Sequence, residues 1–137
     1  MQTNELFPLK AIKEKNFPKF AEITMKDSNQ FHAICLDTYP PCVYMNDVSQ
    51  SIVNYVHDFN QKEGETKVAY TFDAGPNACL YLLEKNVKRV LSFINTIFPN
   101  DNQKTVEYLR GIPTDCSSEV SLPYSIKVSS RLQIVSF

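Results

Sequence analysis

The sequence has little glycine, and its glycines are scattered. Its 137 residues include only three, Gly64, Gly75 and Gly111, so no glycine-rich stretch stands at the start of a helix. Loops of that kind cradle phosphate groups in many nucleotide-binding proteins, because glycine lets backbone N–H groups approach the ligand closely. We therefore expect no nucleotide-phosphate loop of this type within the chain.

Metal-binding side chains are also sparse. The sequence has four cysteines and two histidines: Cys35, Cys42, Cys79, Cys116, His32 and His57. No two cysteines form a Cys-x-x-Cys pair, and the histidines add no pattern that matches them. Zinc sites need ligands at closer and more regular spacing. We therefore expect no metal bound by the protein's own side chains.

The chain lacks an excess of either charge and lacks long apolar runs. Fourteen basic and fifteen acidic residues give a net charge of −1, which argues against binding to nucleic acid or to an anionic membrane surface. Charged residues interrupt the first fifteen positions, so we expect neither a signal peptide nor a membrane span there. Together with the unpaired cysteines, this predicts a cytoplasmic protein with reduced thiols.

The most informative stretch is residues 67–78, with the sequence KVAYTFDAGPNA. The alternation over residues 68–72 predicts a strand. The DAGPN segment that follows predicts a turn, in which Gly75 permits positive φ, and a second apolar run comes next. Asp73 therefore ends a buried strand, beside a loop whose backbone can approach a ligand. By chemistry alone, this aspartate is either an ordinary turn former or a functional carboxylate.

Two helices are predicted before this stretch. The first begins at a cap at Asn16, with Pro18 in its first turn, and ends before the double proline at residues 40–41. Its apolar stripe is expected at Phe17, Phe20, Ile23 or Thr24, and Phe31, toward Leu36. The second begins at a cap at Asn46 or Asp47 and stops at Gly64. Its stripe is expected at Val48, Ile52, Tyr55, Val56 and Phe59.

A third helix is predicted to end at Pro99. Apolar and polar residues alternate over residues 126–134, which predicts a final strand with one face exposed to solvent. This order of elements predicts an α+β fold, with helices packed on one face of a mainly antiparallel sheet. With 43% hydrophobic residues, the chain can form one domain over residues 1–137. Residues 1–15 are interpreted as a truncated lead-in, and residues 100–123 as a variable loop.

A polar segment lies inside the first predicted helix, at residues 25–32. Ser28 and His32 are four residues apart there and share a helix face. Two interpretations are open. The segment is either a solvated face with one hydrogen-bonded histidine, or a helix that lines a ligand cleft.

Several long motifs occur in a fixed order: TMKDSNQFHA (24–33), CLDT followed by PP (35–41), YMN (44–46) and VAYTFDAGPNA (68–78). This series resembles the C-terminal half of eukaryotic mevalonate diphosphate decarboxylases, over about residues 11 to 98. The resemblance implies the GHMP kinase superfamily, a two-domain enzyme and a ferredoxin-like C-terminal domain. Members of the family close this domain with a strand that runs into a Gly-x-Gly-Pro segment. That segment is absent here, so the pairing of the last strand is left open.

The resemblance implies ATP-dependent decarboxylation of mevalonate 5-diphosphate to isopentenyl diphosphate, with ADP, phosphate and carbon dioxide as products, in isoprenoid and sterol synthesis. The family's catalytic aspartate lies in the FDAGPN motif and matches Asp73. Its implied role is to orient the 3-hydroxyl of the substrate and accept its proton during phosphoryl transfer. The substrate-binding candidates are Ser28, Asn29, His32 and Ala74, and no residue is assigned to a metal.

The family's nucleotide loop belongs to an N-terminal domain with no counterpart in this sequence. We therefore expect ATP and Mg²⁺ to be bound mainly by that domain, the intact enzyme to form homodimers, and the 137-residue chain alone to be inactive. The alternative is a non-catalytic ferredoxin-like module that binds a small ligand or the intact enzyme. An enzyme with a cysteine nucleophile is less favoured, because the sequence places no Cys/His pair.

Overall fold

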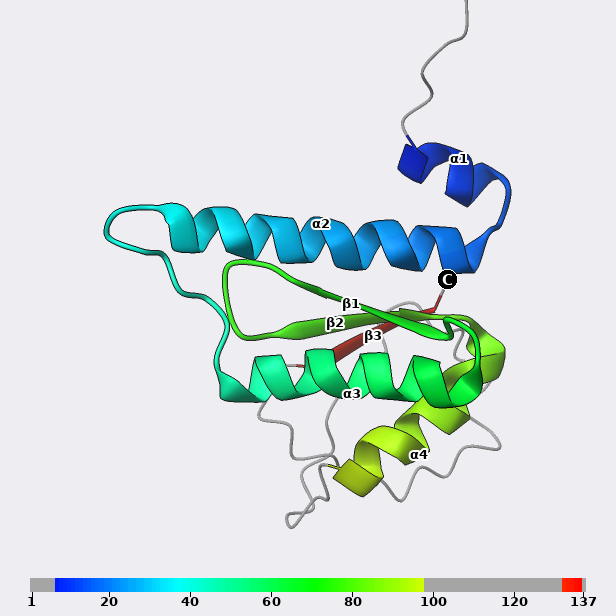
Figure 1. Ribbon diagram of the computed structural model, residues 1–137. Helices are drawn as coiled ribbons and strands as arrows, with labels where there is room; N and C mark the ends of the chain where they lie inside the picture. Colours follow the sequence, from blue (N-terminus) through cyan, green and yellow to red (C-terminus); the bar gives the residue numbers. More distant parts are fainter. Residues whose placement is uncertain (1–6, 98–131, 137) are drawn as a thin grey trace, which may run out of the picture.

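The computed structural model describes residues 7–97 and 132–136 (Figure 1). Its elements, in chain order, are α1 (Phe7–Lys13), α2 (Phe17–Asp37), α3 (Asp47–Glu63), β1 (Val68–Phe72), β2 (Ala78–Leu82), a short 3₁₀ turn η1 (Glu84–Asn86), α4 (Val87–Ile97) and β3 (Leu132–Ser136). The predicted α+β class is confirmed. None of the helices in these ranges is long and apolar enough to cross a membrane.

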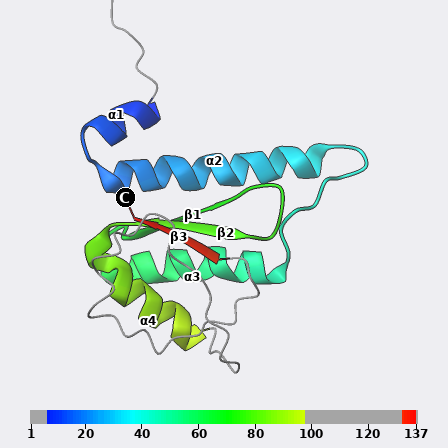
Figure 2. The same ribbon diagram turned by 180° about the vertical axis from the view of Figure 1, so that it is seen from behind.

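The sheet lies between α2 on one side and α3 with α4 on the other (Figures 1 and 2). The order from α3 to β3 is helix, strand, strand, helix, strand, which matches the last five elements of the expected ferredoxin-like motif. The expectation of helices on one face only is wrong. Ala69 is fully buried on the second face, and Phe20 of α2 packs edge-on against Tyr81 of β2 there, with ring centroids 5.5 Å apart.

The three strands are arranged in the order β1-β2-β3. Strands β1 and β2 are antiparallel, with Tyr70 opposite Leu80, and form the predicted pair. Strand β3 joins the other edge of β2 in parallel, with Ile134 beside Leu80. The described sheet is therefore mixed. The last pairing is parallel because the chain returns through α4 before it forms β3.

Helix α2 begins and ends where the sequence predicts. The Asn16 side chain accepts a hydrogen bond from the Lys19 backbone N–H at 3.1 Å, and Pro18 lies in the first turn. The helix ends at Asp37, before the double proline. Thr38 caps this end, and its hydroxyl donates to the Cys35 carbonyl at 2.7 Å.

The apolar stripe predicted for α2 is only partly right. The residues it buries are Phe17, Ala21, Met25, Ser28 and His32, spaced at three and four. Phe31 and Leu36 are instead 43% and 57% exposed. The pattern suggested the wrong face in the second half of the helix, because the face packed on the sheet there carries the polar side chains of Ser28 and His32, which reach the strand backbone.

Helix α3 has a capping box at its start, in which the Asn46 side chain accepts from the Ser49 N–H and the Ser49 hydroxyl accepts from the Asn46 N–H. Gly64 ends the helix in the left-handed conformation, at φ 71°. Both predicted ends are confirmed. The predicted apolar stripe is wrong at Val48, which is 45% exposed. Val53, which was not part of the predicted stripe, is buried.

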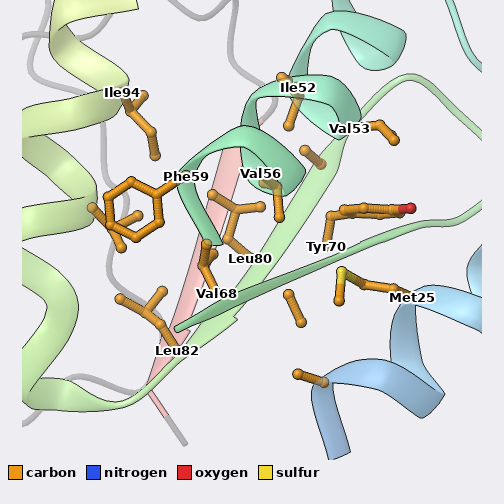
Figure 3. Packing of buried hydrophobic residues seen from close by; sticks show 14 of the residues in the cluster. Met25, Ile52, Val53, Val56, Phe59, Val68, Tyr70, Leu80, Leu82 and Ile94 are labelled. Carbon is orange, nitrogen blue, oxygen red and sulfur yellow. The ribbon is translucent and has the colours of Figure 1, made fainter. Parts of the chain in front are cut away.

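The main core fills the space between the sheet and helices α3 and α4. Figure 3 shows Val68, Leu80 and Leu82 of the strands beside Val56 and Phe59 of α3. Helix α4 packs on the same core through Val90, Leu91 and Ile94. This rigid layer carries the loop between β1 and β2.

Candidate functional site

The DAGPN loop joins β1 to β2 at one end of the sheet, next to the last turns of α2 and the first turn of α3 (Figure 1). Asp73 directly follows the buried strand β1 and is itself exposed, as is Ala74. The Asp73 carbonyl accepts a hydrogen bond from the Gly75 N–H at 2.8 Å, which makes a tight turn. The strand therefore presents a carboxylate to solvent on a short loop.

Gly75 does not adopt the positive φ that the turn sequence suggested, since Gly64 is the only glycine with positive φ in the described ranges. A methyl group added at Gly75 would meet no described atom within 4 Å. The local fold therefore does not require glycine here. The missing side chain leaves open space two residues from Asp73.

Helix α2 binds both backbone groups of Phe72, the residue before Asp73. The Ser28 hydroxyl accepts from the Phe72 N–H at 3.1 Å, and His32 Nε2 lies 2.9 Å from the Phe72 carbonyl oxygen. Because a carbonyl oxygen only accepts, Nε2 carries the hydrogen in this contact. Ser28 and His32 are 3% and 8% exposed. The helix face is therefore not solvated, although its histidine is hydrogen-bonded as the first interpretation required.

Helix α3 holds the other end of the loop through Ser49, which is fully buried. Its hydroxyl lies 3.2 Å from the Pro76 carbonyl oxygen and 3.0 Å from Asn46 Oδ1, so one hydrogen is shared between two acceptors. The sequence interpretation assigned no role to Ser49. The available signal was the Asn46-x-x-Ser49 spacing, which is that of a capping box.

Aromatic side chains pack around His32. Phe31 stacks on Tyr44 with ring centroids 6.4 Å apart, and His32 packs edge-on against both Tyr44 and Phe72. The Tyr70 hydroxyl donates to Asn29 Oδ1 at 3.0 Å. Burial raises the pKa of Tyr70, so its phenol stays neutral. Asn29 is exposed and is held by this hydrogen bond.

The second face of the sheet carries Cys79 and Tyr81, both half-buried. Burial raises the pKa of the Cys79 thiol. A hydrogen bond with Tyr81 lowers this pKa in part, and the negative charge of Asp73 raises it. A thiol with a raised pKa is a poor nucleophile at neutral pH. The environment of Cys79 thus does not favour a cysteine-nucleophile enzyme.

The site residues predicted from the sequence come together in part. Ser28 and His32 meet the strand directly before Asp73 and Ala74, whereas Asn29 contacts the side chain of Tyr70, further back along β1. Within residues 7–97 and 132–136, no three His, Cys, Asp or Glu side chains are grouped closely enough to hold a metal ion.

Comparison with known proteins gives consistent matches. The family model described as mevalonate 5-diphosphate decarboxylase C-terminal domain matches residues 7–135. Diphosphomevalonate decarboxylase of Danio rerio is 50% identical over 113 residues, which are 82% of this chain and 28% of that protein. The solved mevalonate diphosphate decarboxylase from Trypanosoma brucei is 26% identical with a TM-score of 0.71, covering 96% of this chain and 35% of that one.

A second solved structure is that of the mevalonate diphosphate decarboxylase from Enterococcus faecalis, described in terms of ATP binding mediated by mevalonate diphosphate. It is 28% identical with a TM-score of 0.61, covering 69% of this chain and 29% of that one. The chain spans about a quarter of the length of the curated relatives it matches.

Proposed function

Because this chain belongs to the mevalonate 5-diphosphate decarboxylase C-terminal domain family, we propose that it supplies the catalytic carboxylate of an ATP-dependent decarboxylase acting on mevalonate 5-diphosphate. The carboxylate is that of Asp73. The observation that carries this proposal is its placement: an exposed aspartate at the end of a buried strand, on a loop anchored at both ends.

In the proposed reaction, Asp73 accepts a hydrogen bond from the tertiary 3-hydroxyl of the substrate. It takes the hydroxyl proton as phosphate is transferred to that oxygen. Phosphoryl transfer depends mainly on alignment and charge stabilisation, so one well-placed carboxylate suffices on this side of the site. Departure of phosphate and carbon dioxide then forms the double bond of isopentenyl diphosphate, with ADP as the other product.

Two of the four substrate-binding candidates are exposed to solvent and two are buried. Ala74 and Asn29 are exposed, and we assign them to direct contact with the substrate. Ser28 and His32 are buried against the Phe72 backbone, so their contribution to substrate binding passes through the loop. The open space beside Gly75 supports a close approach of the ligand to the backbone.

ATP and Mg²⁺ do not fit the described residues. These residues include no glycine-rich phosphate loop, and no group of side chains among them could hold a metal ion. In this proposal both are bound by a separate N-terminal domain. A structure of the Enterococcus faecalis relative concerns ATP binding, and this chain spans 29% of it. Homodimer formation and a cytoplasmic location stay predictions from the resemblance.

A chimera tests the proposal. Residues 7–97 of this chain would replace the matching segment of the Danio rerio decarboxylase, and decarboxylation would be followed through ADP release. Asp73→Asn should abolish turnover, because an amide cannot take the proton, while Asp58→Asn on the exposed side of α3 should leave it unchanged. Full activity of the Asp73→Asn chimera would refute the proposal. The 137-residue chain alone should be inactive.

A specific observation keeps the second function, a non-catalytic binding module, under consideration. Five large apolar residues near the end of α2 and after it are exposed by 43% to 101%: Phe31, Ile34, Leu36, Tyr39 and Val43. Exposed apolar groups close together are typical of contact surfaces. Mixing the chain with the intact Danio rerio enzyme and measuring the mass of the complex tests this function. The binding-module function would be supported if the chain bound the intact enzyme stably and the chimera that carries residues 7–97 showed no decarboxylation.

A further inference from the structure

We propose that His32 and Ser49 are positioning residues, which hold the catalytic loop from its two ends and so set where the Asp73 carboxylate stands. The inference rests on the proposed function of Asp73. It assigns to two buried side chains a role that acts through the backbone, without contact with the substrate.

The Asp73 side chain depends on its backbone for its position. Within the described part of the chain, no side chain forms a hydrogen bond with its carboxylate. Aspartate has a short side chain with two rotatable bonds, so the carboxylate follows any movement of the loop that carries it. Whatever holds Phe72 and Pro76 therefore also holds the carboxylate.

The first anchor lies on the free edge of the sheet. Strand β1 lies at one edge of the described three-stranded sheet, and every second residue turns its N–H and C=O away from β2. At Phe72 these groups bind Ser28 and His32 instead of a further strand. Both contacts are buried, where hydrogen bonds are less weakened by water. Of the two side chains, His32 donates its hydrogen bond and Ser28 accepts one. The His32 ring also packs edge-on against the Phe72 ring.

The second anchor lies at the start of α3. Ser49 donates to the Pro76 carbonyl and at the same time belongs to the capping box with Asn46. The start of α3 therefore fixes the position of the Ser49 hydroxyl, and the hydrogen bond to the Pro76 carbonyl holds the loop at that position. Only Asp73, Ala74 and Gly75 lie between the two anchors, and the Gly75 N–H binds the Asp73 carbonyl, which limits the displacement of the carboxylate.

Kinetics in the chimera with Danio rerio test the inference through matched variants. His32→Leu and Ser49→Ala each remove one anchor. A misplacement of about 1 Å can lower turnover by about a hundredfold, so kcat should fall by about ten- to a hundredfold. KM for mevalonate 5-diphosphate should change by less than about threefold, because the lost interaction acts mainly in the transition state.

Conservative and control variants separate positioning from a general loss of stability. His32→Gln keeps an N–H donor on the same helix face and should recover kcat to within about threefold of the parent chimera. Ser51→Ala removes a hydroxyl that bonds only within α3, to the Asp47 carbonyl, and should leave kcat unchanged. Leu82→Ala, opposite Val68 at the end of the strand pair far from the loop, destabilises the core and should lower the unfolding temperature without lowering kcat per folded molecule.

Backbone amide exchange in the 137-residue chain gives a second measurement that does not depend on catalysis. His32→Leu and Ser49→Ala should accelerate exchange at the hydrogen-bonded amides of Phe72 and Gly75 by about tenfold or more, while exchange within β2 stays unchanged. Unchanged exchange at these amides overturns the inference, even if the chimera has no activity. Unchanged kcat in both variants also overturns it, provided that Asp73→Asn is inactive. Turnover by Asp73→Asn would instead refute the proposed function.

Discussion

Replacing Asn60 tests how strongly side-chain hydrogen bonds stabilise the start of strand β1. Its side chain forms three hydrogen bonds with the start of β1: Nδ2 donates to the Val68 carbonyl at 2.8 Å, and Oδ1 accepts from the N–H groups of Lys67 and Val68 at 2.8 and 3.1 Å. Val68 is 1% exposed. Water therefore cannot replace these contacts at Val68 without local opening.

The expected cost of Asn60→Ala follows from these contacts. The substitution leaves the buried N–H and C=O of Val68 without partners, and each such group costs about 1–3 kcal/mol. We expect the free energy of unfolding to fall by about 2–6 kcal/mol. This is a large part of the 5–15 kcal/mol typical of a domain. Asn60→Asp keeps one acceptor oxygen but sets its other oxygen against the Val68 carbonyl, so it should also destabilise the chain.

Urea denaturation followed by far-ultraviolet circular dichroism measures this change. With slopes of about 1–3 kcal/mol per molar urea, the midpoint of Asn60→Ala should fall by at least about 0.7 M. Asn54→Ala is the matched control, because Asn54 lies on the exposed side of the same helix. It should stay within about 0.5 kcal/mol of the parent chain. Equal effects of the two alanine substitutions would refute the hydrogen-bonding argument.

Three further outcomes are expected. Hydrogen bonds from Lys67 and Arg89 hold the pKa of Glu63 below its usual value. A lowered pKa stabilises the fold at higher pH, so Glu63→Gln should lower the unfolding temperature at pH 7. The difference should be full above the unfolded-state pKa of about 4.3 and shrink as the pH falls through the lowered pKa of the folded state; a difference that does not shrink between pH 7 and about pH 3 would contradict this. Gly64→Ala should destabilise the chain by about 1 kcal/mol, since Gly64 is left-handed, as urea titration would show. Gly75→Ala should leave stability within about 0.5 kcal/mol but raise KM in the chimera, and a strongly destabilised Gly75→Ala chain would contradict the open space found there.

Local chemistry made several elements of the fold predictable. Asn16 and Asn46 are short polar side chains that satisfy the free N–H groups of a helix start, and Gly64 tolerates the left-handed end of α3. The central strand and its turn were equally clear, because alternation followed by DAGPN is a local signal. The same stretch, with the motifs around it, indicated the family and singled out Asp73.

The buried face of α2 was not predictable in this way. Phe31 is more hydrophobic than Ser28, so the pattern favoured the wrong stripe. Ser28 and His32 are buried because the edge of β1, forty residues later in the sequence, offers the N–H and C=O of Phe72 as partners. A hydropathy pattern contains no information about which distant backbone group a side chain will meet.

The sequence alone determined the ends of α2 and α3, the antiparallel strand pair, the family and the candidate carboxylate, since each depends on residues close together in the chain or on a recognisable motif. Only the tertiary structure decided that helices cover both faces of the sheet, that β3 pairs in parallel, and that Ser49 holds Pro76. These features depend on contacts between segments far apart in the sequence, where geometry and hydrogen bonding outweigh local preference.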